Sequence, residues 1–317
     1  MNEKKLLNNK PKKSLKQSLT KELKRNWELY LLVSVPIAFL IVFSYVPMYG
    51  VQIAFKDYKP GIGVWASEWV GLKHFERFVS NYQFKRIVWN TLAINLYGLC
   101  TFPLSIILAL MLNYIRNQRF KKTVQMISYA PHFISTVIMV GMIIQFLDAK
   151  NGMINHVLGI FGVEAQNYMA KLSYFRHIYV WTDVWQGIGY GSIMYIAALA
   201  SVSPELHEAA IIDGATILQR MRHVDLPGIL PTVAIQLIFR CAGMLSLGYE
   251  KVYLMQNSLN IKHSEVISTY VYKQGLAYKL PQFSYSTAIG LFLSVINLII
   301  LLIVNKITDK ITKTSLF

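Results

Sequence analysis

Residues 284–305 read SYSTAIGLFLSVINLIILLIVN, an apolar run without a charged side chain. A bilayer core about 30 Å thick requires roughly 20 such residues in one helix. Five further segments are of similar length and mainly apolar. The six predicted spans are 29–49, 87–113, 124–147, 177–200, 229–249 and 284–305. The sequence therefore predicts an all-α, polytopic membrane protein with six transmembrane helices.

The composition of the chain supports this class. Only 15% of the 317 residues are charged and 54% are hydrophobic, whereas an ordinary soluble domain carries about a quarter charged residues. The net charge of +16 could indicate nucleic-acid binding, but nine Lys and Arg residues lie in 1–27, directly before the first apolar run. Anionic headgroups attract such a segment. We therefore expect contact with membrane lipid and no nucleic-acid partner.

The basic residues also set the orientation, because cytoplasmic loops carry an excess of Lys and Arg. They are concentrated in the amino-terminal tail, in the connection 114–123 and after the last span. We expect residues 1–28 and 306–317 to be cytoplasmic tails of a multi-pass protein in the bacterial cytoplasmic membrane. The first span is too long for a signal peptide and has no small-residue cleavage site. It is predicted as a retained helix, kinked near Pro36.

One predicted cytoplasmic loop departs from the charge rule, because acidic residues outnumber basic ones in 201–228. It contains SPELHEAAIIDGA at 203–215, in which Ser203 fits an N-cap and Pro204 the first helical position. Gly214 permits a left-handed turn, and a second short helix is expected to reach about His223. The pattern predicts a compact helix–turn–helix. From spacing alone, an ordinary solvated surface hairpin remains an alternative.

The loop resembles the "EAA" loop of permeases from binding-protein-dependent ABC importers. The matching features are Glu-Ala-Ala at 208–210, the extension Asp-Gly-Ala at 213–215, and Leu226-Pro227. The extension resembles the carbohydrate-uptake branch. Together with Asn90-Thr91-Leu92 at the start of the second span, the resemblance covers roughly residues 25–317. It is closest to the first permease of maltose-type systems, in the LplB-like polysaccharide subgroup.

This resemblance implies a type I ABC-importer permease fold with a cytoplasmic coupling helix in 203–227. The ATPase-coupling residues would be Glu208, Ala209, Ala210, Asp213, Gly214, Leu226 and Pro227. Implied partners are a second homologous permease subunit, two ATPase subunits, and an extracellular lipoprotein or periplasmic solute-binding protein that delivers an oligosaccharide. An amino-acid or peptide importer is the alternative.

The chain itself is not expected to be an enzyme or to hold a cofactor. It has no Gly-x-x-x-x-Gly-Lys phosphate loop, so ATP and Mg²⁺ would bind to the ATPase subunits. Two cysteines and scattered histidines predict neither a disulfide framework nor a metal site. A membrane enzyme would need a paired nucleophile and base, and a secondary transporter an inverted repeat. Neither feature is evident.

Polar groups within spans are costly and mark a substrate path. The predicted substrate-path residues are Trp185, Gln186, Gly187, Tyr190, Gln236 and Arg240. By resemblance, Gln186, Gly187 and Tyr190 match pocket positions of the maltose-type permease. Trp185 could instead belong to an interfacial aromatic belt. Arg240 could pair with an acid across the permease dimer or bind a sugar carboxylate. The loops 50–86, 148–176 and 250–283 are expected to face the binding protein.

Overall fold

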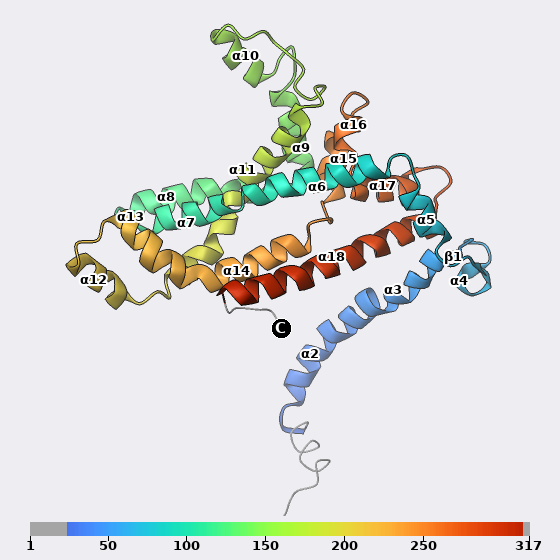
Figure 1. Ribbon diagram of the computed structural model, residues 1–317, viewed down its shortest axis with the longest axis horizontal. Helices are drawn as coiled ribbons and strands as arrows, with labels where there is room; N and C mark the ends of the chain where they lie inside the picture. The colour runs from blue at the N-terminus through green and yellow to red at the C-terminus, as the bar shows by residue number, and fades with distance from the viewer. Residues whose placement is uncertain (1–23, 313–317) are drawn as a thin grey trace, which may run out of the picture.

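The computed structural model describes residues 24–312, and predictions for the remaining parts of both tails lie outside this range. The fold is mostly helical (Figure 1). Its long helices, with the short segments that adjoin them, are α2 (Trp27–Leu40), η1 (Ile41–Tyr45), α3 (Val46–Met48), η2 (Tyr49–Phe55), α6 (Phe84–Cys100), α7 (Pro103–Asn113), α8 (Gln118–Tyr129), η3 (Ala130–Phe133), α9 (Thr136–Phe146), α11 (Tyr174–Leu199), α13 (Ile217–Arg220), η4 (Met221–Asp225), α14 (Leu226–Ala242) and α18 (Phe283–Thr312).

Short elements connect these helices. They are α4 (Gly63–Ala66), α5 (Lys73–Val79), α10 (Met153–Ile160), α12 (Pro204–Ile212), α15 (Tyr249–Met255), α16 (Ile261–Ser264), α17 (Ile267–Tyr272) and η5 (Lys273–Ala277). Two strands, β1 (Lys56–Asp57) and β2 (Glu68–Trp69), pair antiparallel. The all-α prediction is therefore corrected to a mostly helical fold with one antiparallel ribbon of two two-residue strands. This ribbon closes the loop after the first helix.

Four helices in the described part of the chain are long and apolar enough to cross a membrane. They are Trp27–Phe55, Phe84–Asn113, Ile217–Ala242 and Phe283–Thr312. A fifth span is obtained if Gln118–Phe133 and Thr136–Phe146, which meet at an angle of 100°, are taken together. The prediction of a polytopic helical membrane protein is confirmed at this level.

The predicted span 177–200 corresponds to α11, which has 26 residues but is not among these apolar helices. At 1.5 Å per residue it is about 39 Å long and could cross a bilayer. Polar side chains such as Arg176, Asp183 and Gln186 lower its hydropathy. These side chains need protein or water around them, because a lipid environment would leave them unpaired.

Two predicted spans differ from the structure. The span 124–147 is not one straight helix, because η3 contains Pro131 and Ile134 is extended (φ −75°, ψ 127°). The Ser135 hydroxyl then accepts a hydrogen bond from the Ile138 N–H and starts α9 in a new direction. The span 229–249 ends at Ala242, and irregular backbone follows as far as Gly248.

The first helix is the most exposed part of the described chain. No residue of α2, η1 or α3 is buried, and these segments project from the helical body in Figure 1. Pro36 does not end α2, which continues to Leu40. Contact with the body begins at η2, which packs against α18.

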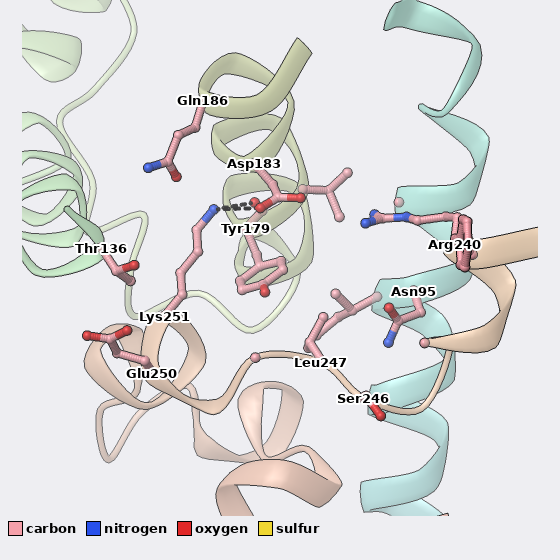
Figure 2. Close-up of a pocket in the computed structure, with 16 residues that line it drawn as sticks. Asn95, Thr136, Tyr179, Asp183, Gln186, Arg240, Ser246, Leu247, Glu250 and Lys251 are labelled. Atoms are coloured by element: carbon pink, nitrogen blue, oxygen red, sulfur yellow. Dashed lines mark hydrogen bonds and ion pairs between the residues drawn. The ribbon is translucent and has the colours of Figure 1, made fainter. Parts of the chain in front are cut away.

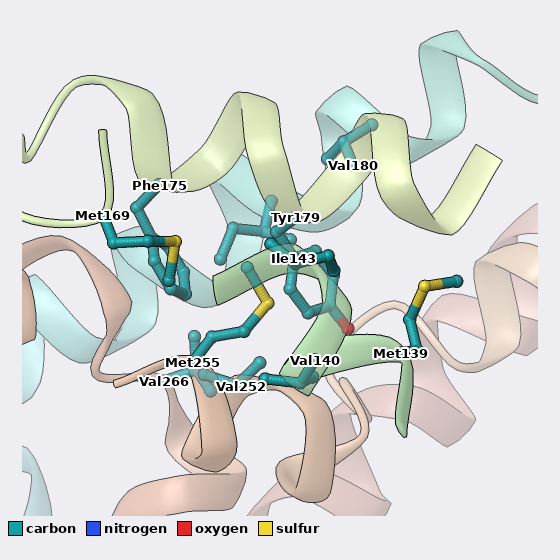
Figure 3. Packing of buried hydrophobic residues seen from close by; sticks show 11 residues of the cluster. Met139, Val140, Ile143, Met169, Phe175, Tyr179, Val180, Val252, Met255 and Val266 are labelled. Atoms are coloured by element: carbon teal, nitrogen blue, oxygen red, sulfur yellow. The ribbon is translucent and has the colours of Figure 1, made fainter. Parts of the chain in front are cut away.

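The helical body is organised around α11, α14 and α18. α11 packs along α7 and α8, and α14 packs along α18. A buried apolar cluster joins α9, α11 and α15 (Figure 3). Its labelled members are Met139, Val140, Ile143, Met169, Phe175, Tyr179, Val180, Val252, Met255 and Val266. The cluster fixes α15 against α11.

Asn90 and Thr91, at the start of the second span, attach an outer segment to the body. The Asn90 amide donates to the carbonyl oxygens of Lys262 and Glu265, at 3.0 and 2.9 Å. The Thr91 hydroxyl accepts a hydrogen bond from the Ile267 N–H. The two side chains therefore satisfy backbone groups of α16 and α17 that have no partner in a regular ladder.

Gly189 allows α11 to approach α8 closely, because a methyl group at this position would overlap the backbone carbonyl of Ser128. We expect Gly189→Ala to destabilise the purified protein by about 1–3 kcal/mol, as overpacking does in well-packed cores. The matched control is Gly290→Ala in α18, where a Cβ meets no atom within 4 Å. Thermal unfolding in detergent measures both. Equal midpoints for the two variants would contradict this packing role.

Candidate functional site

Two adjoining cavities lie between α6, α11 and α14; the larger also reaches the segment 243–251, and the smaller also reaches α7. Their volumes are about 440 and 410 Å³, and both are lined by Gly98, Asp183, Phe239 and Arg240. The irregular backbone from Gly243 to Gly248 forms part of the wall of the larger cavity. Non-helical backbone at membrane depth is tolerated where it is covered by protein or lines a polar cavity.

Lys251 crosses from α15 to α11 in the larger cavity (Figure 2). Its Nζ lies 3.6 Å from Asp183 Oδ1 and donates a 3.3 Å hydrogen bond to the Tyr179 carbonyl oxygen. The same nitrogen lies 4.7 Å from the centre of the Tyr179 ring. A buried ammonium is costly unless such groups compensate it. Lys251 is therefore held by α11 and closes one side of the cavity.

Arg240 is the second cation in the cavity wall. Its guanidinium lies against Gly98, where a Cβ would come within 2.9 Å of Nη2. Among residues 24–312 no carboxylate forms an ion pair with Arg240. Figure 2 shows Glu250 on the opposite side of the cavity. This geometry fits both hypotheses for Arg240, in which its partner is an acid on a second permease subunit or an acid on the substrate.

Four of the six predicted substrate-path residues line the two cavities. Gln186 lines the larger cavity, Gly187 and Gln236 line the smaller, and Arg240 lines both. The Gln186 amide nitrogen donates to the Ile134 carbonyl oxygen at 2.9 Å, so this side chain also satisfies the bend before α9.

The structure does not bring Trp185 and Tyr190 together with these four. Trp185 lines a separate apolar groove of about 350 Å³ with Trp181, on another side of α11. The Tyr190 ring stacks on His132, with ring centres 3.8 Å apart and planes inclined by 4°. Successive residues on a helix point about 100° apart, so neighbours in sequence need not share a cavity.

Sequence reasoning did not select Asp183, Lys251 or Asn95, which also line the larger cavity. Asp183 could have been found, because a carboxylate within a predicted span is a functional candidate. Lys251 lies in the predicted outer loop 250–283. It reaches the cavity because α14 ends at Ala242.

The loop after α11 follows its predicted capping pattern at the start. The Ser203 hydroxyl accepts a hydrogen bond from the Glu205 N–H, and Pro204 begins α12. Gly214 has φ +77°, the left-handed conformation that ends many helices. Thr216 and Gln219 then form a capping box, which sequence reasoning missed.

The second helix of the predicted helix–turn–helix is not a separate short helix. α13 passes through the π-helical segment η4 into α14, so Ile217–Ala242 is continuous. The Leu226 N–H bonds to the Met221 carbonyl five residues earlier. This wider turn stands directly before Pro227, whose ring would otherwise clash with the carbonyl four residues earlier.

α12 is exposed along almost its whole surface and lies at one end of the molecule in Figure 1. Among the predicted coupling residues, Ala210 is half-buried, and Glu208, Ala209, Asp213, Gly214, Leu226 and Pro227 are exposed. Large apolar side chains are also exposed here, with Ile212 at 85% and Leu218 at 74%. Exposed apolar groups gathered in this way on α12 and at the start of α13 indicate an interaction surface.

Asp225 lies beneath this surface and is completely buried. The Tyr114 hydroxyl donates to Asp225 Oδ2 at 2.7 Å. His207 Nε2 lies 3.2 Å from Oδ1, close enough for an ion pair with a protonated imidazole but not aligned as a hydrogen bond. The Arg220 guanidinium lies 5.3 Å from the centre of the Tyr114 ring. Burial and the bond to Asp225 raise the pKa of Tyr114 to about 12, so it remains a donor at neutral pH.

A polar cavity between long apolar helices is the arrangement expected of a membrane transport component. The family model described as "Binding-protein-dependent transport system inner membrane component" matches residues 101–313, and the chain belongs to this family. The predicted resemblance to ABC-importer permeases is confirmed.

Relatives extend over nearly the whole chain. Protein LplB of Bacillus subtilis is 42% identical over 93% of this chain and 92% of its own length. YteP of the same organism, a polygalacturonan/rhamnogalacturonan transport system permease protein, is 39% identical over 96% and 95%. In a crystal structure of a bacterial ABC transporter that imports the acidic polysaccharide alginate, one chain is 36% identical. It has a TM-score of 0.85 and covers 93% of this chain and 99% of its own.

The two faces of α11 can be distinguished by labelling. In a Cys100→Ser, Cys241→Ala background, we expect Gln186→Cys to react with a charged maleimide several-fold faster than Trp185→Cys. The reason is that Gln186 lines the polar cavity, whereas Trp185 lines the apolar groove. Labelling rates in membrane vesicles measure the difference. Equal rates would show that both positions meet the same environment.

Proposed function

We propose that this chain is a permease subunit of an ATP-driven importer that takes up an acidic oligosaccharide delivered by a solute-binding protein. The observation that carries the proposal is the membrane cavity between α11 and α14, with the Arg240 guanidinium in its wall and no acid of residues 24–312 paired with it. Guanidinium groups bind carboxylates through two parallel hydrogen bonds.

The remaining cavity lining suits a hydroxyl-rich ligand. Asn95, Thr136 and Gln186 present amide and hydroxyl groups, and the Glu250 carboxylate can accept hydrogen bonds from sugar hydroxyls. Asp183 and Lys251 pair with each other, so Arg240 is the cation available to a ligand. The names of YteP and of the alginate importer, both concerned with acidic polysaccharides, support the same substrate class.

A full importer requires further subunits. We propose a second, homologous permease that completes the cavity and covers the exposed first helix, and two ATPase subunits that bind ATP and Mg²⁺. A relative of known structure was crystallised with a periplasmic protein carrying an alginate pentasaccharide, which supports a binding protein as the source of substrate. The bent segment α8–α9 and the polar helix α11 would then be spans, giving six in all with both termini cytoplasmic.

The exposed face of α12 is proposed as the docking site for an ATPase. Glu208 offers a charge to basic groups of the partner, and Ala209 and Ala210 permit close approach of its surface. Leu206 and Ile212 would be covered in the complex, which accounts for their exposure in the isolated chain.

We expect Glu208→Lys and Gly214→Val to uncouple ATP hydrolysis from uptake while leaving membrane insertion intact. The first reverses the docking charge, and the second places a β-branched residue at φ +77°. Gly162→Val is a matched control, because Gly162 has φ +78° in the turn after α10 and is equally unobstructed. Transported substrate per ATP hydrolysed is the measurement. Wild-type ratios for both coupling variants would contradict the docking role.

We expect Arg240→Gln to lower uptake of an acidic probe such as oligogalacturonate roughly tenfold or more, because a charge-assisted bidentate contact is lost. Arg119→Gln, at an exposed arginine of α8, serves as the control. Co-purification of all subunits is measured in parallel. Selective loss of uptake supports recognition of a carboxylate, whereas loss of assembly would show that Arg240 pairs with the second permease.

A further inference from the structure

Asp225 is a buried carboxylate within the predicted coupling loop 203–227. Side chains from two other elements contact it, His207 from α12 and Tyr114 from the end of α7, and Arg220 of α13 lies over the Tyr114 ring. A buried carboxylate without hydrogen-bond or ionic partners is strongly disfavoured. These contacts therefore hold α12 and the end of α7 against Asp225, which lies in the continuous helix Ile217–Ala242.

α12 has few other side-chain contacts with the body. Of its nine residues, seven are exposed, and the two that are half-buried are His207 and Ala210, three apart on one side of the helix. His207 is the polar group of α12 that reaches a buried partner. The contact between His207 and Asp225 thus helps to fix the orientation of α12 relative to the membrane helices.

Both membrane helices that meet at Asp225 also line the cavity. α14 begins at the residue after Asp225 and carries Gln236 and Arg240, about 16 and 22 Å further along a regular helix. Tyr114 is the C-cap of α7, which continues the helix Phe84–Asn113 that carries Gly98. A displacement of Asp225 would therefore move two walls of the cavity together.

We propose that Asp225 is a positioning residue that links the docking helix α12 to the cavity walls α6–α7 and α14. Movement of α12 by the ATPase is transmitted through His207 to Asp225, and from Asp225 to both helices. The link deepens the proposed function and depends on it. Gly214 and Thr216 set the geometry of the loop, whereas the buried carboxylate transmits the movement of α12 to the two membrane helices.

The test uses the complete importer with both permeases, the ATPases and the binding protein, in nanodiscs. Gln186→Cys in a background without other cysteines in this chain reports the cavity, and its maleimide labelling rate is compared before and after trapping with ATP and vanadate. Asp225→Asn removes the charge with little change in shape, and Tyr114→Phe removes one hydroxyl. Asp309→Asn, at an exposed aspartate of α18, is the matched control.

We expect Asp225→Asn to leave assembly and ATP hydrolysis intact but to reduce the ATP-dependent change in labelling roughly tenfold, since a charge-assisted contact is lost. Tyr114→Phe should reduce it less, and Asp309→Asn not at all. His207→Gln should have little further effect in an Asp225→Asn background, because both changes break the same contact.

Two results would overturn the inference. One is an unchanged ATP-dependent labelling response in Asp225→Asn and Tyr114→Phe. The other is failure of both variants to assemble, which would assign the cluster to folding alone. A wild-type complex whose cavity labelling does not respond to ATP would instead contradict the proposed function itself, so the two failures are distinguishable.

Discussion

The absence of water from the bilayer core is the constraint on which this structure depends. Each backbone N–H and C=O at membrane depth must find a partner within the protein. Regular helices meet this requirement along most of the chain, and the exceptions identify where function lies. After α14 ends at Ala242, the Leu245 N–H is bonded by the Asn297 side chain of α18, which also donates to the Ser246 hydroxyl. The break is thus supported from α18, and it forms a wall of the cavity.

Buried charged side chains also need partners within the protein. Lys251 is buried beside Asp183 and Tyr179, and Asp225 beside Tyr114 and His207, so each buried ion has a specific partner from another element. The desolvation cost of such a pair offsets much of its electrostatic gain, but the pair favours one arrangement of the elements that it joins. Arg240 differs from both, because it lies in the cavity wall without a carboxylate partner among the described residues. An unpaired cation in a polar cavity is suited to a ligand that carries an acid.

Much of the fold could be predicted from hydrophobicity and a few capping residues. The long apolar runs at 29–49, 87–113 and 284–305 lie within continuous helices, and Ser203, Pro204 and Gly214 start and end α12 as their chemistry requires. The failures have physical causes. The bend at Ile134 and the end of α14 at Ala242 depend on tertiary hydrogen bonds from Gln186 and Asn297, which a hydropathy window cannot detect.

Some of the residues that line the cavities could likewise be chosen from the sequence. Gln186, Gly187, Gln236 and Arg240 line the cavities because polar residues in an apolar helix need a polar environment. Trp185, chosen as an aromatic side chain of the same span, and Tyr190, chosen by resemblance, lie elsewhere because of helical rotation. Tyr114 carried no signal in the sequence, because its role depends on a contact with a residue 111 positions away.

We propose that ATP, and not an ion gradient, drives an acidic oligosaccharide through a cavity built partly by this chain. The most direct measurement is uptake of labelled oligogalacturonate and alginate oligosaccharides into proteoliposomes that contain the complete importer, with ATP inside and the solute-binding protein outside. We expect uptake of at least one probe, and we expect this uptake to require both ATP and the binding protein. Uptake that proceeds without ATP and follows a proton or sodium gradient would contradict it.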